Sequence, residues 1–171
     1  MVINHTVASH RGPAAAAANF TGTVFGLIPL SLTMLALRFA LAIPFWYSGL
    51  TKWDGFLTLS FGAKILFAQE FKLHVFGSEI PYPVPELMAT LSGLAEVCLP
   101  VLLVLGVGTR YAALGLLGMT AIIQLTIPDA WANFHLPWAA MALAIMTFGP
   151  GRIALDPLLG IDGLPRANGI S

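Results

Sequence analysis

The chain has 171 residues, of which 57% are hydrophobic and only 9% are charged, whereas a soluble domain is roughly 25% charged. A soluble protein of this size could not hide so much apolar surface, so the composition predicts an all-α integral membrane protein in contact with the lipid bilayer. The formal net charge of zero argues against nucleic acid as a partner. The single cysteine, Cys98, excludes an internal disulfide, a CxxC redox pair and a thiolate metal cluster.

Residues 1–31 are predicted to form a mobile tail that leads into a semi-apolar segment at the membrane interface. Pro29 is expected to separate this interfacial lead from the first membrane span, because proline interrupts a helix. Arg11 is the only Lys or Arg before the uncharged run 12–37, and the apolar pattern continues beyond that run. The pattern therefore favours an uncleaved first membrane helix over a secretory signal peptide.

A helix that crosses a bilayer needs about 20 mostly apolar residues at a rise of ~1.5 Å each. Four segments meet this requirement, at approximately 32–52, 85–105, 111–127 and 131–148. The connections at 106–110 and 128–131 are short, so the last three spans should be antiparallel neighbours. The sequence thus predicts a four-helix transmembrane bundle over 32–160, followed by a C-terminal tail at 161–171.

The longest connection, 53–84, joins the first two spans. Within it, the stretch LSFGAKILFAQEFKLHVF places apolar residues at helical spacing among Lys64, Glu70 and Lys72. This spacing predicts an amphipathic interfacial helix on the membrane surface. Prolines at 81, 83 and 85 follow, and they are expected to set the angle at which the second span begins.

The distribution of cationic residues favours one orientation of the bundle. The side that holds both termini carries four arginines outside the spans, and the opposite loop carries three lysines. Loops rich in Lys and Arg tend to stay in the cytoplasm. The termini are therefore predicted to be cytoplasmic, by a margin of one charge, in a multi-pass protein.

Glu96 lies near the centre of the second span, ~15 Å from either interface at the helical rise. An ionisable group at this depth is costly and normally faces protein or a water-filled cavity. Two interpretations follow: Glu96 locks the bundle, or it serves as a proton-relay, quinone or ligand group. Arg38, which matches it in depth, is the first expected partner. Lys52 is the second, unless its ammonium group extends to the lipid headgroups.

His135 begins the fourth span together with two tryptophans at one-turn spacings, Trp131 and Trp138. An aromatic box beside an imidazole could hold a flat ligand such as a quinone ring, although an interfacial aromatic belt is the more ordinary explanation. His135 could also serve as a proton donor or a metal ligand. A metal site built from Glu96, His135 and a methionine lacks the i,i+3 or i,i+4 ligand spacing of helical metal sites, so no metal residue is assigned.

The order of these motifs resembles the DoxX family. The resemblance rests on LRFALAIPFWYSGLTKW in the first span, LSGLAEVCLPVLLVLG in the second, the GVGTR turn with AALGLLGM, and the closing HLPWAAMALAIMTFGPGRIALDPLLG. It covers approximately residues 32–160. The residues that match recurrent positions of the family pattern are Arg38, Gly49, Lys52, Glu96, Gly106, Thr109, Arg110 and His135.

The resemblance implies a small bacterial inner-membrane protein with four spans. Founding relatives are linked with a thiosulfate:quinone oxidoreductase, and others with a membrane oxidoreductase complex in oxidative and thiol stress. The implied function is a subunit associated with quinone- or thiol-linked redox chemistry or stress defence, with a soluble or membrane redox protein as partner and a quinone as cofactor. The residues expected to serve it are a polar cluster of Glu96, Arg38 and Lys52 with His135, and a quinone pocket at Trp131 and Trp138.

Two alternatives stay open. The chain could be a non-enzymatic membrane anchor or assembly partner that holds a soluble enzyme, with Glu96 as a lock between helices. It could instead handle a metal or another small solute. Whether the chain is itself an enzyme or a subunit of a membrane oxidoreductase is not decided by its sequence.

Overall fold

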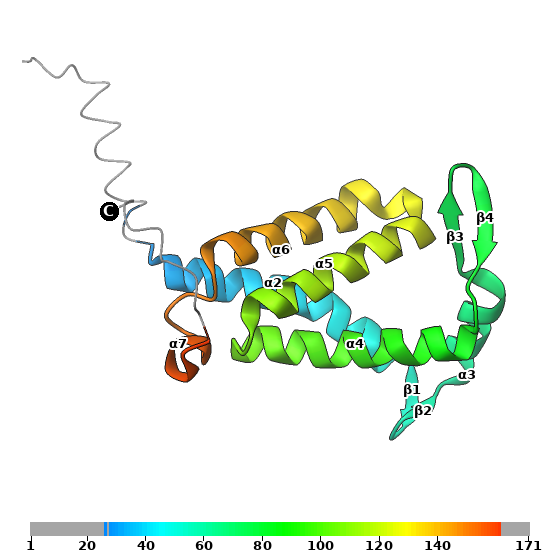
Figure 1. The fold of residues 1–171 in the computed structure, drawn as a ribbon, viewed down its shortest axis with the longest axis horizontal. Helices are drawn as coiled ribbons and strands as arrows, with labels where there is room; N and C mark the ends of the chain where they lie inside the picture. The colour runs from blue at the N-terminus through cyan, green and yellow to red at the C-terminus, as the bar shows by residue number, and fades with distance from the viewer. Residues whose placement is uncertain (1–25, 27, 162–171) are drawn as a thin grey trace, which may run out of the picture. The chain divides into compact units, whose positions relative to one another are not determined.

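The computed structural model describes residues 26 and 28–161, and these are mostly helical (Figure 1). Residues 31–161 belong to one compact unit. The predicted mobile tail and most of the interfacial lead lie outside the described residues, as does the C-terminal tail after Ile161.

Four helices occupy the segments predicted as spans. They are α2 (Leu30–Leu50), α4 (Pro85–Leu105), α5 (Thr109–Thr126) and α6 (Leu136–Phe148), the last preceded without a break by the π-helical turn η3 (Trp131–His135). Their ends lie within two residues of the predicted ends when the turn η3 is counted with α6, which itself begins five residues after the predicted start. Among the described residues, α2 and α4 are long and apolar enough to cross a membrane, at 21 residues each. At ~1.5 Å per residue, each is about 31 Å long, which matches the hydrocarbon core of a bilayer.

Local sequence explains where α4 begins and ends. Pro85 stands at its first position, where the missing N–H would be unpaired in any case. Gly106 ends the helix in the left-handed conformation, with φ of +74°, which a residue without a side chain adopts at no steric cost. Gly108 has φ of +56° and begins α5 two residues later. The Gly-x-Gly turn therefore reverses the chain within three residues.

Helices α2 and α4 are staggered along their axes. A Cβ added to Gly49, near the end of α2, would lie 3.0 Å from the Cβ of Glu96, in the middle of α4. The first half of α4 therefore extends past the end of α2. The 53–84 segment packs there instead, and the ring of Trp53 lies against Gly93 of α4.

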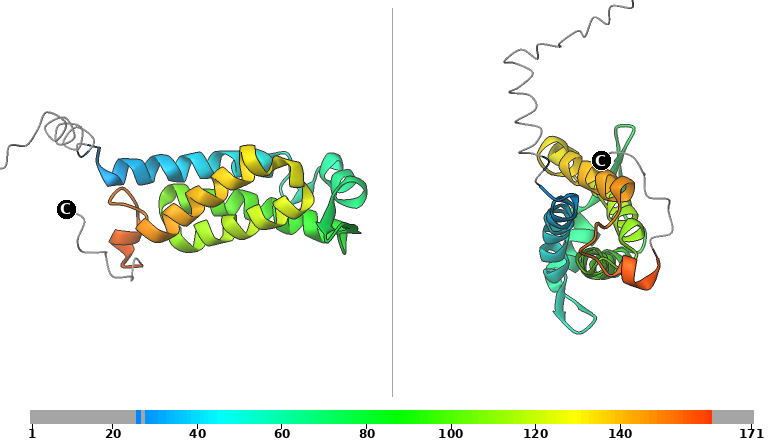
Figure 2. Two further views of the ribbon diagram at one scale, coloured as in Figure 1. Left: turned by 90° about the horizontal axis from the view of Figure 1, so that it is seen from above. Right: turned by 90° about the vertical axis from the view of Figure 1, so that its left-hand side faces the viewer.

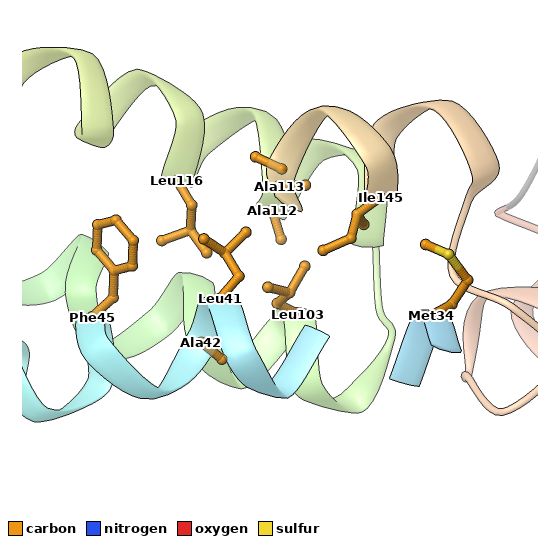
Figure 3. Packing of buried hydrophobic residues seen from close by; sticks show 10 residues of the cluster. Met34, Leu41, Ala42, Phe45, Leu103, Ala112, Ala113, Leu116 and Ile145 are labelled. Carbon is orange, nitrogen blue, oxygen red and sulfur yellow. The ribbon is translucent and has the colours of Figure 1, made fainter. Parts of the chain in front are cut away.

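All four long helices contribute to one buried apolar cluster (Figure 3). The large side chains that form its centre come from different helices, and the alanines between them let the helix backbones approach. The buried members are Met34, Leu41, Ala42, Phe45, Leu103, Ala112, Ala113, Leu116, Ala142 and Ile145.

The 53–84 segment is not a single amphipathic helix with flanking loops, so that prediction is wrong in extent. Its elements are β1 (Trp53–Gly55), β2 (Thr58–Leu59), α3 (Phe61–Ile65), the π-helical turn η1 (Leu66–Glu70), β3 (Lys72–Val75) and β4 (Ser78–Pro81). The helical part ends at Glu70 because Phe71 is extended. The strands pair into two antiparallel hairpins, β1–β2 and β3–β4. The predicted all-α class is therefore corrected to a mostly helical fold with two small hairpins.

The close approach of α2 to α4 can be tested at Gly49. We expect Gly49→Leu to lower the free energy of unfolding by about 1–3 kcal/mol, as overpacking typically does, because the new side chain would meet Glu96 and Val97. Gly118→Leu is the matched control, since a Cβ there meets nothing within 4 Å and leucine is the better helix former. Denaturant titration of both variants in detergent, followed by circular dichroism, gives the comparison. Equal stabilities would contradict the observed packing.

Candidate functional site

Glu96 forms a buried ion pair with Lys52. The Lys52 Nζ lies 2.5 Å from the Glu96 Oε2, and the two residues are 8% and 3% exposed. Ser92, one turn before Glu96, donates a hydrogen bond of 3.0 Å to the other carboxylate oxygen, Oε1. Ser48, one turn before Lys52, lies with its Oγ 3.2 Å from the ammonium nitrogen. The pair is thus held by one serine on each side.

The first expected partner of Glu96 was Arg38, and that pairing is wrong. The stagger of α2 against α4 brings the end of α2, not its middle, level with Glu96. The second expectation, Lys52 with Glu96, is the pair that the structure contains. The Lys52 ammonium group is therefore directed to Glu96 and is buried.

A cavity of about 360 Å³ lies beside this ion pair. The four polar residues described above, Ser48, Lys52, Ser92 and Glu96, all line it. The rest of its wall is almost entirely apolar and is contributed by α4, α5 and the 53–84 segment. These lining residues are Phe67, Phe71, Tyr82, Met88, Leu91, Ala95, Met119, Ile122, Ile123, Thr126 and Ile127. The cavity thus combines one ionic, hydrogen-bonding region with a large apolar surface.

Aromatic residues of the 53–84 segment form one side of the cavity. The ring of Phe67 lies 5.2 Å from that of Phe71 and 5.6 Å from that of Tyr82, measured between centroids. The Tyr82 hydroxyl is 2.6 Å from the Oγ1 of Thr126, at the end of α5. This hydrogen bond joins the loop wall to the helical wall.

Arg38 lies elsewhere, at the C-terminal end of α4. Its guanidinium donates to the carbonyl oxygens of Leu103, at 2.7 Å, and of Val104. It also donates to the carbonyls of Pro150, at 3.2 Å, and of Ile153, at 2.5 Å. Leu103 is seven residues beyond Glu96, or ~10 Å along the axis at the helical rise. Arg38 therefore binds buried and partly buried carbonyls at a helix end and does not line the cavity.

Asp156 stabilises the turn on the same side of the molecule. Its carboxylate accepts hydrogen bonds from the backbone N–H groups of Gly108, at 2.6 Å, and Thr109, at 2.9 Å. An acid at a helix N-terminus is favourable because it satisfies unpaired donors and complements the helix dipole. Asp156 and Arg38 thus bind opposite helix ends, the start of α5 and the end of α4.

The predicted quinone pocket at the start of the fourth span is not the cavity beside Glu96. His135 is buried, and its Nδ1 lies 2.6 Å from the Oε1 of Gln124. The Trp138 ring packs between Phe45 and His135, at centroid distances of 5.0 and 5.4 Å, and Trp131 is 47% exposed. None of His135, Trp131 and Trp138 lines the cavity beside Glu96.

Several residues of the site were not anticipated. Ser48 stands four residues before Lys52 and Ser92 four before Glu96, so the i,i+4 spacing could have identified both serines. No local signal marks Phe67, Phe71 or Tyr82 as cavity residues, because their placement depends on how the 53–84 segment folds back. Within residues 26 and 28–161, no three His, Cys, Asp or Glu side chains gather in a group that could hold a metal ion.

The sequence of the chain is similar to those of known proteins. The family model described as DoxX matches residues 33–129, which is more than half of the chain. An uncharacterized protein of Haemophilus influenzae is 31% identical over 136 residues, covering 75% of this chain and 83% of that protein. No solved structure matches the chain.

Proposed function

Because the chain belongs to the DoxX family, and two of its helices could cross a bilayer, we propose that it is a membrane subunit that binds a quinone beside Glu96 and Lys52. In this proposal α5 and the continuous η3–α6 helix complete a four-span bundle in the bacterial inner membrane, with cytoplasmic termini. A redox partner protein supplies the electrons. The observation that carries the proposal is the cavity beside the buried Lys52–Glu96 pair.

The residues of the cavity fit a quinone by size and by chemistry. A volume of about 360 Å³ lies within the roughly 300–1,000 Å³ of small-molecule sites. Apolar and aromatic walls suit a flat, uncharged ring, and Phe67 and Phe71 offer ring faces for such packing. The two charged groups, Lys52 and Glu96, are paired with each other, and the Tyr82 and Thr126 hydroxyls of the wall are hydrogen-bonded to each other. Most of the remaining wall is apolar, as expected for a ligand that is apolar except for its oxygens.

Lys52 and Glu96 would supply the polar chemistry. When bound, a quinone supplies a couple that takes up two electrons and two protons. The Lys52 ammonium can donate a hydrogen bond to a ring carbonyl oxygen, and the Glu96 carboxylate can accept one from a ring hydroxyl. Ser92 holds the carboxylate in place through Oε1. The Lys52–Glu96 pair itself is buried, and a low local dielectric strengthens hydrogen bonds made there.

The packing of Glu96 favours a second candidate function, an anchor or assembly partner for another protein. Helix α2 approaches Glu96 so closely at Gly49 that an added Cβ would lie 3.0 Å from the Glu96 Cβ. Both carboxylate oxygens already have partners within the chain. A residue satisfied in this way can join two helices without binding a ligand. In that case the Lys52–Glu96 pair is a lock between α2 and α4.

Quinone binding by the purified protein separates the two functions. We expect Glu96→Gln in lipid nanodiscs to bind a short-chain quinone at least about tenfold more weakly than the wild type, which corresponds to ~1.4 kcal/mol. The loss of the charged hydrogen-bond acceptor is its cause. Isothermal titration calorimetry measures the affinity. Glu86→Gln is the matched control, because Glu86 lies in the first turn of the same helix and is exposed.

Folding of each variant is followed by thermal melting in the same nanodiscs. A wild-type protein that binds no quinone, or a Glu96→Gln variant that binds it as tightly as the wild type, would contradict the quinone proposal. If the wild-type protein binds no quinone and Glu96→Gln melts at a lower temperature than the wild type, the results would favour the anchor or assembly function.

A further inference from the structure

The tips of the two hairpins in the 53–84 segment are apolar and uncovered. Phe56, at the turn of β1–β2, is 94% exposed, and Phe76, at the turn of β3–β4, is 103% exposed. Leu57, beside Phe56, is 59% exposed. These two phenylalanines are the most exposed large apolar side chains of the described residues. Neither phenylalanine lines the cavity described above, and no part of the described chain covers them.

Backbone conformation makes these tips unusual. Leu57 has φ of 52° and Phe76 has φ of 50°, in the left-handed region where glycine, asparagine or aspartate is normally found. A bulky apolar side chain at such a position carries a steric cost. In water it gains nothing in return, because it is not buried. The hairpin bodies differ from the tips: β3 and β4 carry an exposed Lys72–Glu79 ion pair of 3.0 Å. The β3–β4 body therefore mixes charged and apolar side chains, such as Ile80 at 47% exposure, whereas the most exposed apolar side chains stand at the two tips.

Both hairpins extend sideways from the helix bundle, and in different directions (Figures 1 and 2). The β1–β2 hairpin begins at Trp53, whose ring packs on Gly93 of α4. Gly93 is eight residues inside α4, or ~12 Å along its axis, so this hairpin begins beside the part of α4 that extends past the end of α2. The β3–β4 hairpin is joined to the last turn of α5, where the His74 Nδ1 lies 3.1 Å from the carbonyl oxygen of Leu125.

Elements that extend sideways at the end of a membrane bundle run along the bilayer surface. Helix α2 is about as long as the hydrocarbon core is thick, and the β1–β2 hairpin begins at Trp53, three residues after α2 ends at Leu50. A bilayer whose core matches α2 therefore places this hairpin at the interface between headgroups and acyl chains. Aromatic side chains are favoured at that interface. Burial of Phe56 and Phe76 in lipid would offset the backbone cost of the two turns.

We propose that the tips of the β1–β2 and β3–β4 hairpins insert into the bilayer interface and hold the 53–84 segment on the membrane surface. This inference goes beyond the proposed function, because it depends on membrane embedding and not on quinone binding. The occupant is lipid, continuous with the lipid around the helices. In this proposal the two hairpin tips, and not an amphipathic helix, attach the 53–84 segment to the membrane.

Spin labels placed on the tips test the inference. In a Cys98→Ala background, single cysteines replace Phe56 or Phe76, and the labelled full-length protein is reconstituted into phosphatidylcholine–phosphatidylglycerol vesicles. Electron paramagnetic resonance then compares collisions with oxygen, which dissolves in lipid, and with a nickel chelate, which stays in water. Labels at the tips should collide mainly with oxygen.

Asp54→Cys and Glu79→Cys are the matched controls, because both residues are charged, exposed and within three residues of a tip. Labels there should collide mainly with the nickel chelate. Tip labels that match these controls would overturn the proposal, since the tips would then lie in water, whether free or reserved for a partner protein. Leu57→Cys reports on the first tip if a label at position 56 disturbs the hairpin. If the protein binds no quinone but its tip labels lie in lipid, the proposed function would be wrong and this inference would stand.

Discussion

Replacing Glu96 with leucine is expected to lower the free energy of unfolding by about 3–5 kcal/mol, the usual cost of removing one member of a buried ion pair. The loss arises because Lys52 is left in a buried position without the carboxylate that lies 2.5 Å from it. Ser48 alone cannot replace a carboxylate, because its hydroxyl carries no charge. Unfolding in mixed micelles by a denaturing detergent measures the difference.

The double variant Lys52→Met/Glu96→Leu should recover most of this loss, because buried ion pairs exchanged for apolar residues are often neutral or stabilising. The two single variants and the double variant form a cycle whose non-additivity gives the coupling energy. Glu86→Leu, at an exposed position of the same helix, controls for the loss of a surface acid. If Glu96→Leu destabilised no more than Glu86→Leu, the pair would not be a structural element of the folded state.

The double variant also separates stability from ligand binding. Its cavity keeps its volume and apolar wall but loses the ionic region. If the double variant is stable but no longer binds quinone, Lys52 and Glu96 contribute to quinone binding. A stable double variant that binds quinone as before would assign the ion pair to architecture.

Arg38→Met is expected to lower the free energy of unfolding by about 3 kcal/mol or more. Four backbone carbonyls, those of Leu103, Val104, Pro150 and Ile153, lose the guanidinium that binds them. The Leu103 carbonyl keeps the Gly106 N–H as a partner, at 3.2 Å. Each acceptor that is left without a partner costs roughly 1–3 kcal/mol, although neighbouring losses do not add fully. Thermal melting in detergent measures the change.

Arg38→Lys should restore only part of the stability, because an ammonium group is a point charge and does not have the planar set of donors that reaches carbonyls on two segments. Arg152→Met is the matched control. The Arg152 side chain is exposed, and the interaction described for this residue uses its backbone N–H. Equal melting temperatures for Arg38→Met and Arg152→Met would contradict the role assigned to Arg38.

The helices were predictable from sequence because their apolar runs are long and are bounded by clear signals. Pro85 begins α4, and Gly106 with Gly108 separates α4 from α5. The burial of Glu96 against α2 was also predictable, since Glu96 shares a face with Gly93 and that face permits close packing. These inferences depend on local features that a single segment carries.

The partner of Glu96 was not predictable, because the register of one helix against another is a property of the assembled bundle. Matching Arg38 to Glu96 by depth assumed that α2 and α4 begin and end at the same levels. The observed stagger brings Gly49 to Glu96 and Arg38 to the end of α4. The aromatic wall of the cavity was missed because its position depends on how the 53–84 segment folds back onto the helices.

The β3–β4 hairpin was missed because its strand residues also fit a helical pattern. Leu73 and Val75 continue the apolar spacing of the preceding helix. The turn at Phe76 and Gly77 nevertheless places these residues in a strand that pairs with β4. Gly77 has φ of +81°, which lets the chain reverse and pair Val75 with Ser78. Helical periodicity over a short stretch therefore did not exclude a strand pair.

The contacts of Arg38 also bear on the order in which the chain can be assembled during synthesis. Two of its acceptors, at Pro150 and Ile153, follow it by 112 and 115 residues. At about 5–20 residues per second, a ribosome needs roughly 6–23 s to reach them. Until then the first helix holds an arginine whose acceptors are half missing, a costly state in lipid. The nascent bundle can therefore close fully only after its last helix has emerged, and a chain cut short before Pro150 would be left open for membrane quality-control proteases.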